Sequence, residues 1–594
     1  MNTWQPVAGH LMSRWAAKID PENAWRSYPR PQMTRPEWLN LNGLWEYAIT
    51  PRHQKAIAKF DGSILVPFSI ESALSGVKRP LHPKERLWYR RIFNVPLEWQ
   101  EQRILLHFGA VDWETQVWLN GQVAGIHLGG YLPFSFDITL HLQTGENELL
   151  VAVWDPTDSH WQARGKQVLH PNSIWYTAVS GIWQTVWLEP VPDTYIVGLK
   201  ITPDVDAGLV RVSAQLDGPD SGNTLIKVQE TGRTIAQAET TTADREVEVP
   251  LPEPKLWSPE APYLYDLVIE TAADRVESYF GMRKFGLGRD PQGRIRLCLN
   301  NQPVFQFGPL DQGYWPDGLY TPPSEEAMRS DLELIKDLGC NMLRKHVKVE
   351  PARYYYDCDR LGLIVWQDMP NGGRAVGLPL SYLANMIEVK RRDDRWLWRA
   401  GRRHPVSRQD FRRELQEMVD HLHNFACIGM WVPFNEGWGQ FEASAITDWL
   451  KLYDPTRPVD HASGWFDQGG HDFKSLHVYF KDLPLLEPEE QRALILSEFG
   501  GYSLKIDGHM WNPQGEFGYR KFPDATSLTV AYVALLETQL KPWIEKGLSA
   551  AVYTQTTDVE IEVNGFITYD RQVAKMNFEQ VRQAHQNLSG NYKA

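Results

Sequence analysis

The chain has 594 residues, too many for one hydrophobic core, so we expect two to four domains. Its 61 Lys and Arg against 74 Asp and Glu leave a formal net charge of −13, which argues against nucleic acid and anionic membranes as partners. The four cysteines show no CxxC spacing, so neither a zinc site nor a disulfide framework is indicated, and a reducing compartment fits.

The first 25 residues are polar and lack the apolar stretch of a signal peptide, and no run in the chain is long enough to cross a bilayer. We therefore expect a cytoplasmic protein. The 25 tryptophans favour a carbohydrate-handling protein only weakly, because Trp rings stack on sugar faces but also fill cores.

Residues 1–190 are predicted to form an all-β domain. Short β-branched and aromatic runs alternate with Gly and Pro turns, and Asn120-Gly121 between two such runs is a strong hairpin signal. This pattern is typical of a jelly-roll sandwich. Residues 191–290 are predicted to form an immunoglobulin-like β-sandwich, because strands recur at 209–214, 224–228, 245–249 and 264–269. The open-ended sandwiches could support a homo-oligomer.

From residue 291 to 594, strand-like and helix-like segments alternate, which indicates a parallel sheet with crossover helices. Ser324 followed by two glutamates starts a helix that Gly339 ends, and another helix is expected over 527–546. The number of units and the length predict a (β/α)8 barrel. Its strands are expected at 304–307, 341–346, 363–366, 429–434, 459–463, 476–479, 494–497 and 550–554.

A long insertion at 371–408 separates the third expected strand from its helix. It contains a cluster of charged residues at 390–403. We interpret this cluster as a solvated face or as a rim over the mouth of a site, since charge runs most often face water.

Two apolar runs of the predicted barrel end in a carboxylate, Glu436 after the fourth strand and Glu498 after the seventh. Barrel enzymes carry their chemistry at the carboxyl ends of the strands, so both side chains are expected to face one cleft. Paired carboxylates cleave glycosidic bonds, and at roughly 5–5.5 Å separation one attacks the sugar and configuration is retained. We assign Glu436 as acid/base and Glu498 as nucleophile. The structural alternative is that each caps a strand or pairs with an arginine.

Neighbouring residues could support this pair. Asn435 can hydrogen-bond the sugar 2-hydroxyl or cap the loop that follows. Tyr479 can donate to Glu498 or pack in the core. Arg344 can polarise Glu498 or form a barrel-core ion pair, and Trp438 can line the sugar. Four residues at the ends of the first and eighth strands could read the sugar hydroxyls or form turn and loop structure, namely Asp311, Trp315, Asp558 and Glu560. His346 and Tyr553 are further candidate substrate contacts.

Short motifs recur along the whole chain beside the two carboxylates. They are NGLW at 42–45, SGIW at 180–183, LWSPE at 256–260, FGMR at 280–283, NMLR at 341–344, CDRLGL at 358–363, Asn435-Glu436 and SEFG at 497–500. With these motifs the chain resembles, over nearly its whole length, glycoside hydrolase family 2, which contains β-galactosidases, β-glucuronidases and β-mannosidases. The resemblance implies retaining exo-β-glycosidase activity with Glu436 and Glu498 in the roles above, and it matches Tyr479 to the family tyrosine beside the nucleophile.

Three departures from the family pattern bear on the sugar. The Asn-x-Lys that holds a glucuronide carboxylate is expected just before Gly565, where the chain has Glu562-Val563-Asn564, so a glucuronide is disfavoured. No histidine follows Glu498, and the third strand runs into Gln367-Asp368, which argues against a galactosidase-type magnesium site. The chain ends after the predicted barrel, as expected of the short three-domain branch.

We therefore expect a cytoplasmic, β-galactosidase-like retaining enzyme that removes a terminal sugar from a glycoside without a cofactor or metal. A β-glucuronide or another β-glycoside is the first alternative substrate. A sugar-binding protein with an inactive barrel is remote, because both carboxylates are present. A metal-dependent barrel hydrolase would need a His-x-His on the first strand, which residues 304–311 do not contain.

Overall fold

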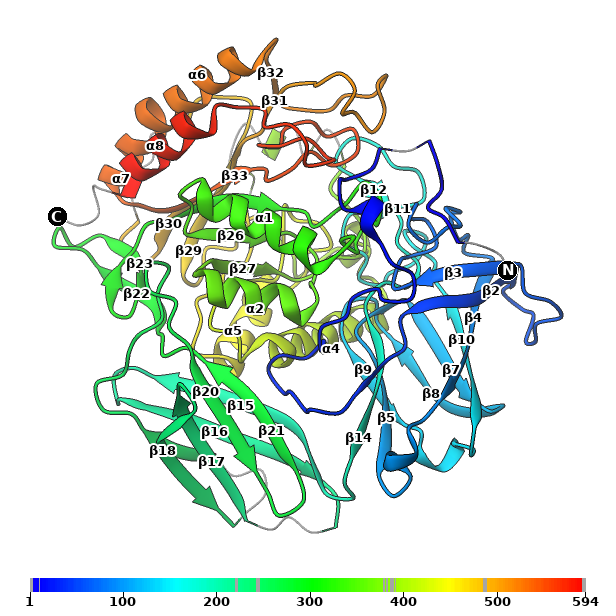
Figure 1. Cartoon of the computed structure of the whole chain (residues 1–594). Coiled ribbons are helices and arrows are strands. Elements are labelled where there is room, and N and C mark those ends of the chain that lie inside the picture. The colour runs from blue at the N-terminus through cyan, green and yellow to red at the C-terminus, as the bar shows by residue number, and fades with distance from the viewer. Residues whose placement is uncertain are drawn as a thin grey trace.

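The computed structural model describes residues 4–9, 11–219, 223–241, 246–377, 380, 383–384, 389, 391–483 and 489–589. Two β-sandwiches lie beside a barrel of parallel strands and helices, with the N-terminal sandwich on one side and the second sandwich below (Figure 1). Within the described residues, no helix combines the length and apolar character needed to cross a bilayer.

The N-terminal sandwich consists of two antiparallel sheets, which confirms the predicted jelly roll. Asn120 and Gly121 form the expected hairpin turn with φ of 50° and 78°. Apolar side chains from both sheets, among them Trp45 and Tyr89, are buried between them. One sheet contains β1 (Leu39–Asn40), β14 (Val186–Val191), β5 (Arg103–Phe108) and β9 (Phe134–Asp137); the other contains β3 (Gly62–Val66), β2 (Gly43–Pro51), β4 (Glu85–Asn94), β10 (Glu146–Trp154), β7 (Glu114–Leu119) and β8 (Gln122–Leu128).

The second sandwich has the expected immunoglobulin-like form, two sheets around a separate apolar core. The strand expected at 245–249 is observed from Val247, and Arg245 lies outside the described residues. The three-stranded sheet contains β15 (Tyr195–Asp204), β16 (Leu209–Asp217) and β19 (Val247–Pro250); the four-stranded sheet contains β18 (Arg233–Thr240), β17 (Thr224–Glu230), β20 (Tyr265–Glu270) and β21 (Arg275–Phe280).

Seven parallel strands form the barrel wall in the order β28-β27-β26-β25-β33-β30-β29. The expected fifth strand at 459–463 is present only as two parallel bridges, Trp431 to Val459 and Asn435 to Ser463. Because this segment lies between β28 and β29 in the chain, it fills the gap in the curled sheet. The strands are β25 (Gln306–Asp311), β26 (Met342–Lys345), β27 (Ile364–Asp368), β28 (Ile428–Val432), β29 (Phe473–Val478), β30 (Ala493–Gly500) and β33 (Leu548–Thr554).

Several expected strand boundaries differ from the observed ones. The fourth strand ends at Val432 instead of residue 434, and the sixth begins at Phe473 instead of residue 476. The first and seventh strands differ as well. The first barrel strand begins at Gln306 instead of residue 304, because the preceding residues belong to a small antiparallel sheet of β22 (Phe285–Arg289), β23 (Ile295–Leu299) and β24 (Gln302–Pro303). The backbone N–H of Val304 accordingly donates to Leu297, in β23. The seventh strand continues to Gly500, so Glu498 lies inside β30 and not beyond its end.

The helices cover the outside of the barrel, with α1 and α2 in front of β26 and β27 in Figure 1. The predicted N-cap is confirmed, since Ser324 accepts a hydrogen bond from the N–H of Ala327. The helix expected at 527–546 is continuous but contains a π-helical turn at Leu536–Leu540 before Pro542. The helices are α1 (Glu325–Asp337), α2 (Ala352–Leu361), α4 (Pro405–Leu422), α5 (Ala443–Tyr453), α6 (Ala525–Leu535), α7 (Lys541–Lys546) and α8 (Phe578–Ser589).

Short elements complete the chain. Single-turn 3-10 helices occur at Ala16–Lys18, Leu97–Trp99, Thr139–His141 and Leu397–Ala400. Two-residue strands pair β6 (Val111–Asp112) with β13 (Gly181–Ile182), β11 (Gln167–Val168) with β12 (Tyr176–Thr177), and β31 (Tyr502–Ser503) with β32 (Arg520–Lys521).

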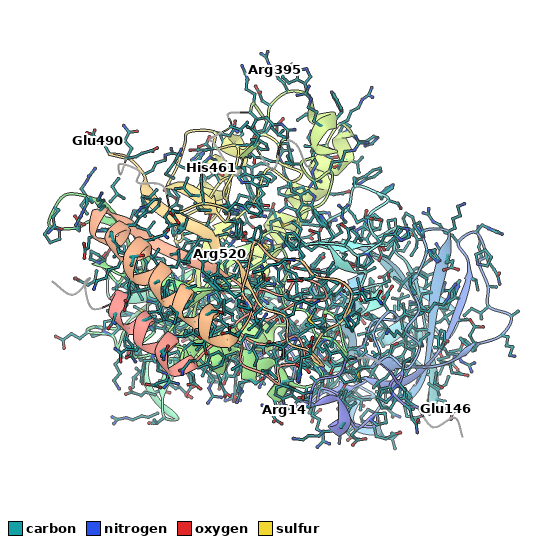
Figure 2. All side chains as sticks on the ribbon, turned by 90° about the horizontal axis from the view of Figure 1, so that it is seen from above. Arg14, Glu146, Arg395, His461, Glu490 and Arg520 are labelled. Carbon is teal, nitrogen blue, oxygen red and sulfur yellow. The ribbon has the colours of Figure 1, made fainter. Side chains whose placement is uncertain are left out.

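The insertion after β27 contacts the loop that follows Glu436. Gln440 in that loop donates to Asp393 at 2.9 Å, and Arg402 donates to the carbonyl of Gly439 at 3.2 Å. Arg395 stands at the outer edge of the molecule (Figure 2). These contacts favour a rim for the described part of the charge cluster, whereas its first residue, Lys390, lies outside the described residues.

Candidate active site

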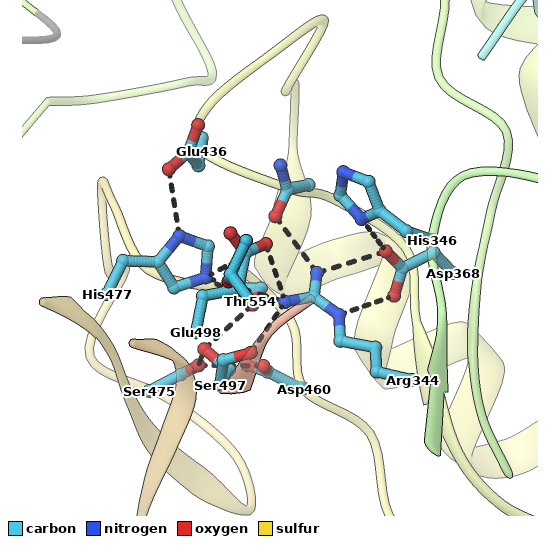
Figure 3. Close-up of polar contacts among 12 residues, drawn as sticks. Arg344, His346, Asp368, Glu436, Asp460, Ser475, His477, Ser497, Glu498 and Thr554 are labelled. Carbon is cyan, nitrogen blue, oxygen red and sulfur yellow. Dashed lines mark hydrogen bonds and ion pairs between the residues drawn. The ribbon is translucent and has the colours of Figure 1, made fainter. Parts of the chain in front are cut away.

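Arg344 on β26 is the centre of a buried polar network (Figure 3). Its guanidinium makes two 3.0 Å contacts to the two carboxylate oxygens of Asp368, at the end of β27. Its remaining donors lie 3.0 Å from Oε1 of Glu498 and 2.9 Å from Oδ1 of Asn435. A fully buried guanidinium needs such partners, because its charge is poorly tolerated away from water. Arg344 therefore fixes three side chains at the carboxyl ends of the strands.

Glu498 is held as a carboxylate. Burial acts to raise its pKa, but the charges of His477 and Arg344 outweigh burial and lower the pKa to about 2. The hydroxyl of Tyr479, just past β29, donates to the second oxygen of Glu498, as the sequence predicted. The ring of Tyr519 stacks on that of Tyr479 at 3.9 Å and fixes its position. The site thus presents an ionised, oriented carboxylate.

Glu436 is more open to solvent than Glu498, with its side chain 17% exposed against 6%. It follows β28, and its backbone N–H donates to the carbonyl of Ser463 at 2.9 Å. One carboxylate oxygen from each glutamate lies, together with a nitrogen of His477, in a group of atoms within 4.8 Å of one another. This separation is close to the roughly 5–5.5 Å found between the carboxyl groups of retaining glycosidases.

His477 joins the two carboxylates, a role that sequence reasoning missed. Its Nδ1 lies 2.9 Å from Glu436, and its Nε2 lies 3.7 Å from Glu498 and 3.1 Å from the hydroxyl of Ser463. The available signal was the alternation of a strand, which places residues 477 and 479 on the same face. Gly464 leaves room for the ring, since a Cβ there would approach it to 2.4 Å.

Glu436, His477 and Glu498 are also the residues of the described chain that could together hold a metal ion. Arg344 places a positive charge 3.0 Å from one of these ligand oxygens. A divalent cation there would be repelled by the guanidinium, so the donor set fits a metal poorly. The prediction that no metal takes part remains a prediction.

His346 and Trp438 border the network. Nδ1 of His346 lies 2.7 Å from Asp368, and burial together with the charges of Lys166 and Arg344 holds its pKa well below the usual value, so the ring is neutral. Trp438 meets the edge of Trp175 at 4.8 Å, with the ring planes at 90°. Because Trp175 belongs to the N-terminal 190 residues, that part of the chain helps to form the mouth of the site.

Sequence models of glycosyl hydrolases family 2 match three consecutive parts of the chain. The sugar-binding domain model matches residues 60–192, the central family model matches 194–283, and the TIM barrel domain model matches 323–589. The chain belongs to glycosyl hydrolase family 2.

Relatives within family 2 carry different names. The chain is 26% identical over 520 residues to a putative β-glucuronidase of Formosa agariphila, covering 82% of this chain and 60% of that protein. It is 25% identical over 551 residues to a β-galactosidase of Psychromonas ingrahamii, covering 81% of this chain and 50% of the relative. The chain thus spans about half to three fifths of these curated relatives.

Solved structures of family 2 members share the fold. A β-D-glucuronidase of Dictyoglomus thermophilum superposes with a TM-score of 0.71 at 18% identity, over 95% of this chain and 98% of that one. A β-galacturonidase of Eisenbergiella tayi bound to galacturonate gives a TM-score of 0.70 at 19% identity, over 94% and 99% of the two chains.

Three of the weaker candidates have structural partners away from the two glutamates. Asp311 pairs with Lys345 at 2.7 Å and accepts from the hydroxyl of Tyr354 at 2.6 Å. Trp315 is buried under Arg571, whose guanidinium lies 3.8 Å from its ring centre. Tyr553 is fully buried among aromatic rings of the barrel core. These contacts fit the turn and loop role that was the alternative for Asp311 and Trp315, and sugar binding by the three residues remains a prediction.

Asp558 and Glu560 follow β33 and are also committed to protein partners. Asp558 pairs with Lys575 at 2.6 Å, and burial raises its pKa to about 6. Glu560 accepts the backbone N–H of Thr177, in β12, at 2.8 Å, and burial raises its pKa to about 7. Glu560 thereby ties the barrel to the N-terminal domain.

Sequence reasoning gave no role to several residues that the structure places at the network, namely Asp368, Ser463, His477, Tyr519 and Lys166. Asp368 and His477 stood within motifs that had already been noted. Lys166 and Tyr519 come from loops far away in sequence, so no local pattern could associate them with the barrel strands.

Proposed function

We propose that this family 2 chain is a retaining exo-β-glycosidase with Glu498 as nucleophile and Glu436 as acid/base. The observation that carries the proposal is the pair of carboxylates within 4.8 Å of each other in unlike surroundings. Glu498 is ionised beside Arg344 and Tyr479, whereas Glu436 is exposed enough to exchange protons with the leaving group and with water. Such division of roles is what double displacement requires.

The reaction would proceed in two steps. Glu498 attacks the anomeric carbon while Glu436 donates its proton to the glycosidic oxygen, so the aglycone leaves as an alcohol and a glycosyl ester forms. Glu436, now a carboxylate, then takes a proton from water, and the resulting hydroxide attacks the same carbon. The ester bond breaks, Glu498 is restored, and the sugar leaves with its original β configuration.

The finer assignment concerns the sugar. A β-galactoside is the first candidate, because the Asn-x-Lys pattern of glucuronide recognition is missing before Gly565. A β-uronide is the second candidate, favoured by the similarity to a putative glucuronidase and to glucuronidase and galacturonidase structures. The cytoplasmic location, the homo-oligomer and the domain boundaries at 190 and 290 remain predictions from sequence.

Initial rates on nitrophenyl β-glycosides, run beside Glu498→Ala, test the function. We expect one sugar to be hydrolysed, the variant to lose at least about 1,000-fold in kcat, and proton NMR to show the β anomer as first product. Glu442→Ala, which removes a partly exposed glutamate of the same barrel paired with Arg412, is the matched control and should retain activity. An α anomer as first product, or a fully active Glu498→Ala, would contradict the mechanism.

A further inference from the structure

Lys166 is a buried lysine that forms no ion pair with a carboxylate in the described part of the chain. Only 8% of the residue is exposed. Among the described residues, no carboxylate lies within 4.0 Å of its ammonium group, and the ammonium makes no hydrogen bond. Its Nζ lies 5.6 Å from the ring centre of Tyr176. Burying a charge in this way is costly unless something compensates it.

The backbone on both sides holds Lys166 firmly at the barrel mouth. Gly165 has φ of +56°, and a Cβ there would come within 2.7 Å of the hydroxyl of Tyr320 and of the Val347 carbonyl. The amide of Gln167 donates to Asp112 at 2.9 Å, and its oxygen accepts from the N–H of Val179 at 2.6 Å. The ammonium is thus presented by a rigid turn rather than by a mobile loop.

The charge of Lys166 acts on the catalytic network. It contributes to lowering the pKa of Glu498 and of neutral His346, and it also lowers that of Glu562. The turn that carries Lys166 lies at the carboxyl ends of the barrel strands, because the backbone N–H groups of Arg164 and Gly165 donate to the carbonyl of Asn371, three residues after β27, at 3.0 and 3.1 Å. Tyr176, whose ring centre lies 5.6 Å from Nζ, donates to Glu562 in the loop after β33. A terminal sugar bound at Glu498 would lie at this same end of the barrel.

Glu562, in place of the Asn-x-Lys pattern, is engaged by protein donors. The hydroxyl of Tyr176 donates to one carboxylate oxygen and Asn564 donates to the other at 3.0 Å, and burial raises the pKa of Glu562 above the usual value. Because both oxygens are already engaged and burial favours the neutral acid, Glu562 would repel a uronic acid less than a free carboxylate would.

We propose that Lys166 binds the carboxylate of a β-linked uronic acid, so that the substrate class of this site is a β-glucuronide or β-galacturonide. The inference rests on the proposed glycosidase chemistry, and it favours the second candidate sugar, a β-uronide, over the β-galactoside. A uronate would pair the buried ammonium and form a charge-assisted hydrogen bond, whereas a neutral sugar would supply only a hydroxyl. The loop before Gly565 lacks the lysine of the Asn-x-Lys pattern, and Lys166 would supply the cation in its place.

The test compares nitrophenyl β-glucuronide and β-galacturonide with the matching glucoside and galactoside. We expect the wild type to prefer a uronide over its neutral counterpart by about 100-fold in kcat/KM. Lys166→Met should lose about 100-fold on the uronide and much less on the neutral sugar, and Lys166→Arg should restore part of the loss. Lys59→Met, which removes an exposed lysine of the same domain, is the control.

A binding measurement covers the case of an inactive protein. Millimolar glucuronate or galacturonate should raise the melting temperature of the wild type but not of Lys166→Met, and glucose and galactose should have little effect. If neutral sugars are preferred, or Lys166→Met loses activity equally on both kinds, the inference is wrong while the glycosidase proposal stands. If no glycoside is cleaved, the glycosidase proposal fails and the uronate-induced shift decides the role of Lys166. If Lys166→Met does not fold, the inference is tested by the preference of the wild type for uronides over neutral sugars and by the uronide activity of Lys166→Arg.

Discussion

His477 couples the acid/base glutamate to the rest of the network. Its two nitrogens reach Glu436 at 2.9 Å and Ser463 at 3.1 Å, with no exposed side-chain surface. A fixed partner holds a carboxyl group in the geometry that proton transfer needs. The histidine is therefore a positioning residue, which acts on the substrate through Glu436.

His477→Gln should impair proton donation more than nucleophilic attack. We expect kcat/KM to fall by about 100-fold for glycosides with poor leaving groups, because their departing oxygen needs a proton. The loss should be far smaller for dinitrophenyl glycosides, because Arg344 and Tyr479 still hold Glu498 as an oriented carboxylate when the charge of His477 is removed. Rates across a series of leaving groups measure this difference. His509→Gln, which removes a histidine paired with Asp570 elsewhere in the barrel, should leave the series unchanged. An equal loss for all leaving groups would refute the positioning role.

At the scale of elements, the loop after the 459–463 segment determines whether His477 fits. Gly464 and Gly469 have nearly the same backbone, with φ of 82° and 81°. A Cβ on Gly464 would approach the His477 ring to 2.4 Å, whereas a Cβ on Gly469 would meet nothing within 4 Å. The two glycines thus separate backbone strain from steric displacement of the histidine.

Gly464→Ala and Gly469→Ala should each lose about 1 kcal/mol of stability from the left-handed backbone. Only Gly464→Ala should also reduce kcat, by more than about tenfold, because the histidine must move away from Glu436. Melting temperatures and initial rates of the two variants make the comparison. Equal kcat values for Gly464→Ala and Gly469→Ala would show that the His477 ring can be displaced without loss of activity, which contradicts the prediction.

The helix α4 carries a carboxyl group on its buried face. Glu414 is 5% exposed, burial raises its pKa to about 8, and Arg413 lies 3.6 Å away. Its folded-state pKa is above the usual 4.5, so the folded protein holds this proton more tightly than the unfolded chain does. Stability is therefore lost as the pH rises from about 4.5 to about 8.

Glu414→Gln should remove that loss. We expect the melting temperature of the variant to match that of the wild type near pH 5 and to exceed it near pH 8. The free energy of unfolding at pH 8 should rise by up to roughly a few kcal/mol. Melting curves across this range test the prediction. Glu417→Gln, one turn later and 43% exposed, is the control that should show no gain growing with pH. If Glu414→Gln raises the melting temperature equally at pH 5 and pH 8, ionisation of Glu414 is not the cause of the increase.

Sequence reasoning predicted the order of the domains and most barrel strands, because buried strands and hairpin turns leave local patterns in apolar and glycine residues. It placed Glu436, Glu498, Tyr479 and Arg344 together for the same reason, since each lies at a strand end. The expected fifth strand was wrong in kind, because Val459-Asp460-His461-Ala462-Ser463 takes part only in isolated parallel bridges. Lys166 and Tyr519 could not be found this way, since their positions depend on how distant loops close over the barrel.

At the scale of the whole molecule, Arg35 joins the two sandwiches. Its guanidinium lies 3.0 Å from Glu189 on β14 and 2.6 Å from Asp274, between β20 and β21, and it is 5% exposed. Burial acts to raise the pKa of Glu189, but Arg30, His107 and Arg35 outweigh it and hold that pKa well below the usual value. Stability from Glu189 is therefore full above about pH 4.5 and is lost progressively in more acidic solution.

Arg35→Met should leave two buried carboxylates short of a partner and cost about 3–5 kcal/mol at pH 7. Arg103 offers a matched control, because it also bridges the sandwiches, to Asp137 at 2.9 Å and Asp217 at 3.1 Å, but these carboxylates are 36% and 51% exposed. Arg103→Met should cost less than about 1 kcal/mol. Denaturant unfolding of both variants at pH 7 and pH 3 measures the difference, which should shrink in acid as Glu189 is protonated. If both variants lose the same stability at pH 7, the burial of Arg35 with Glu189 and Asp274 adds nothing to the stability of the contact between the sandwiches.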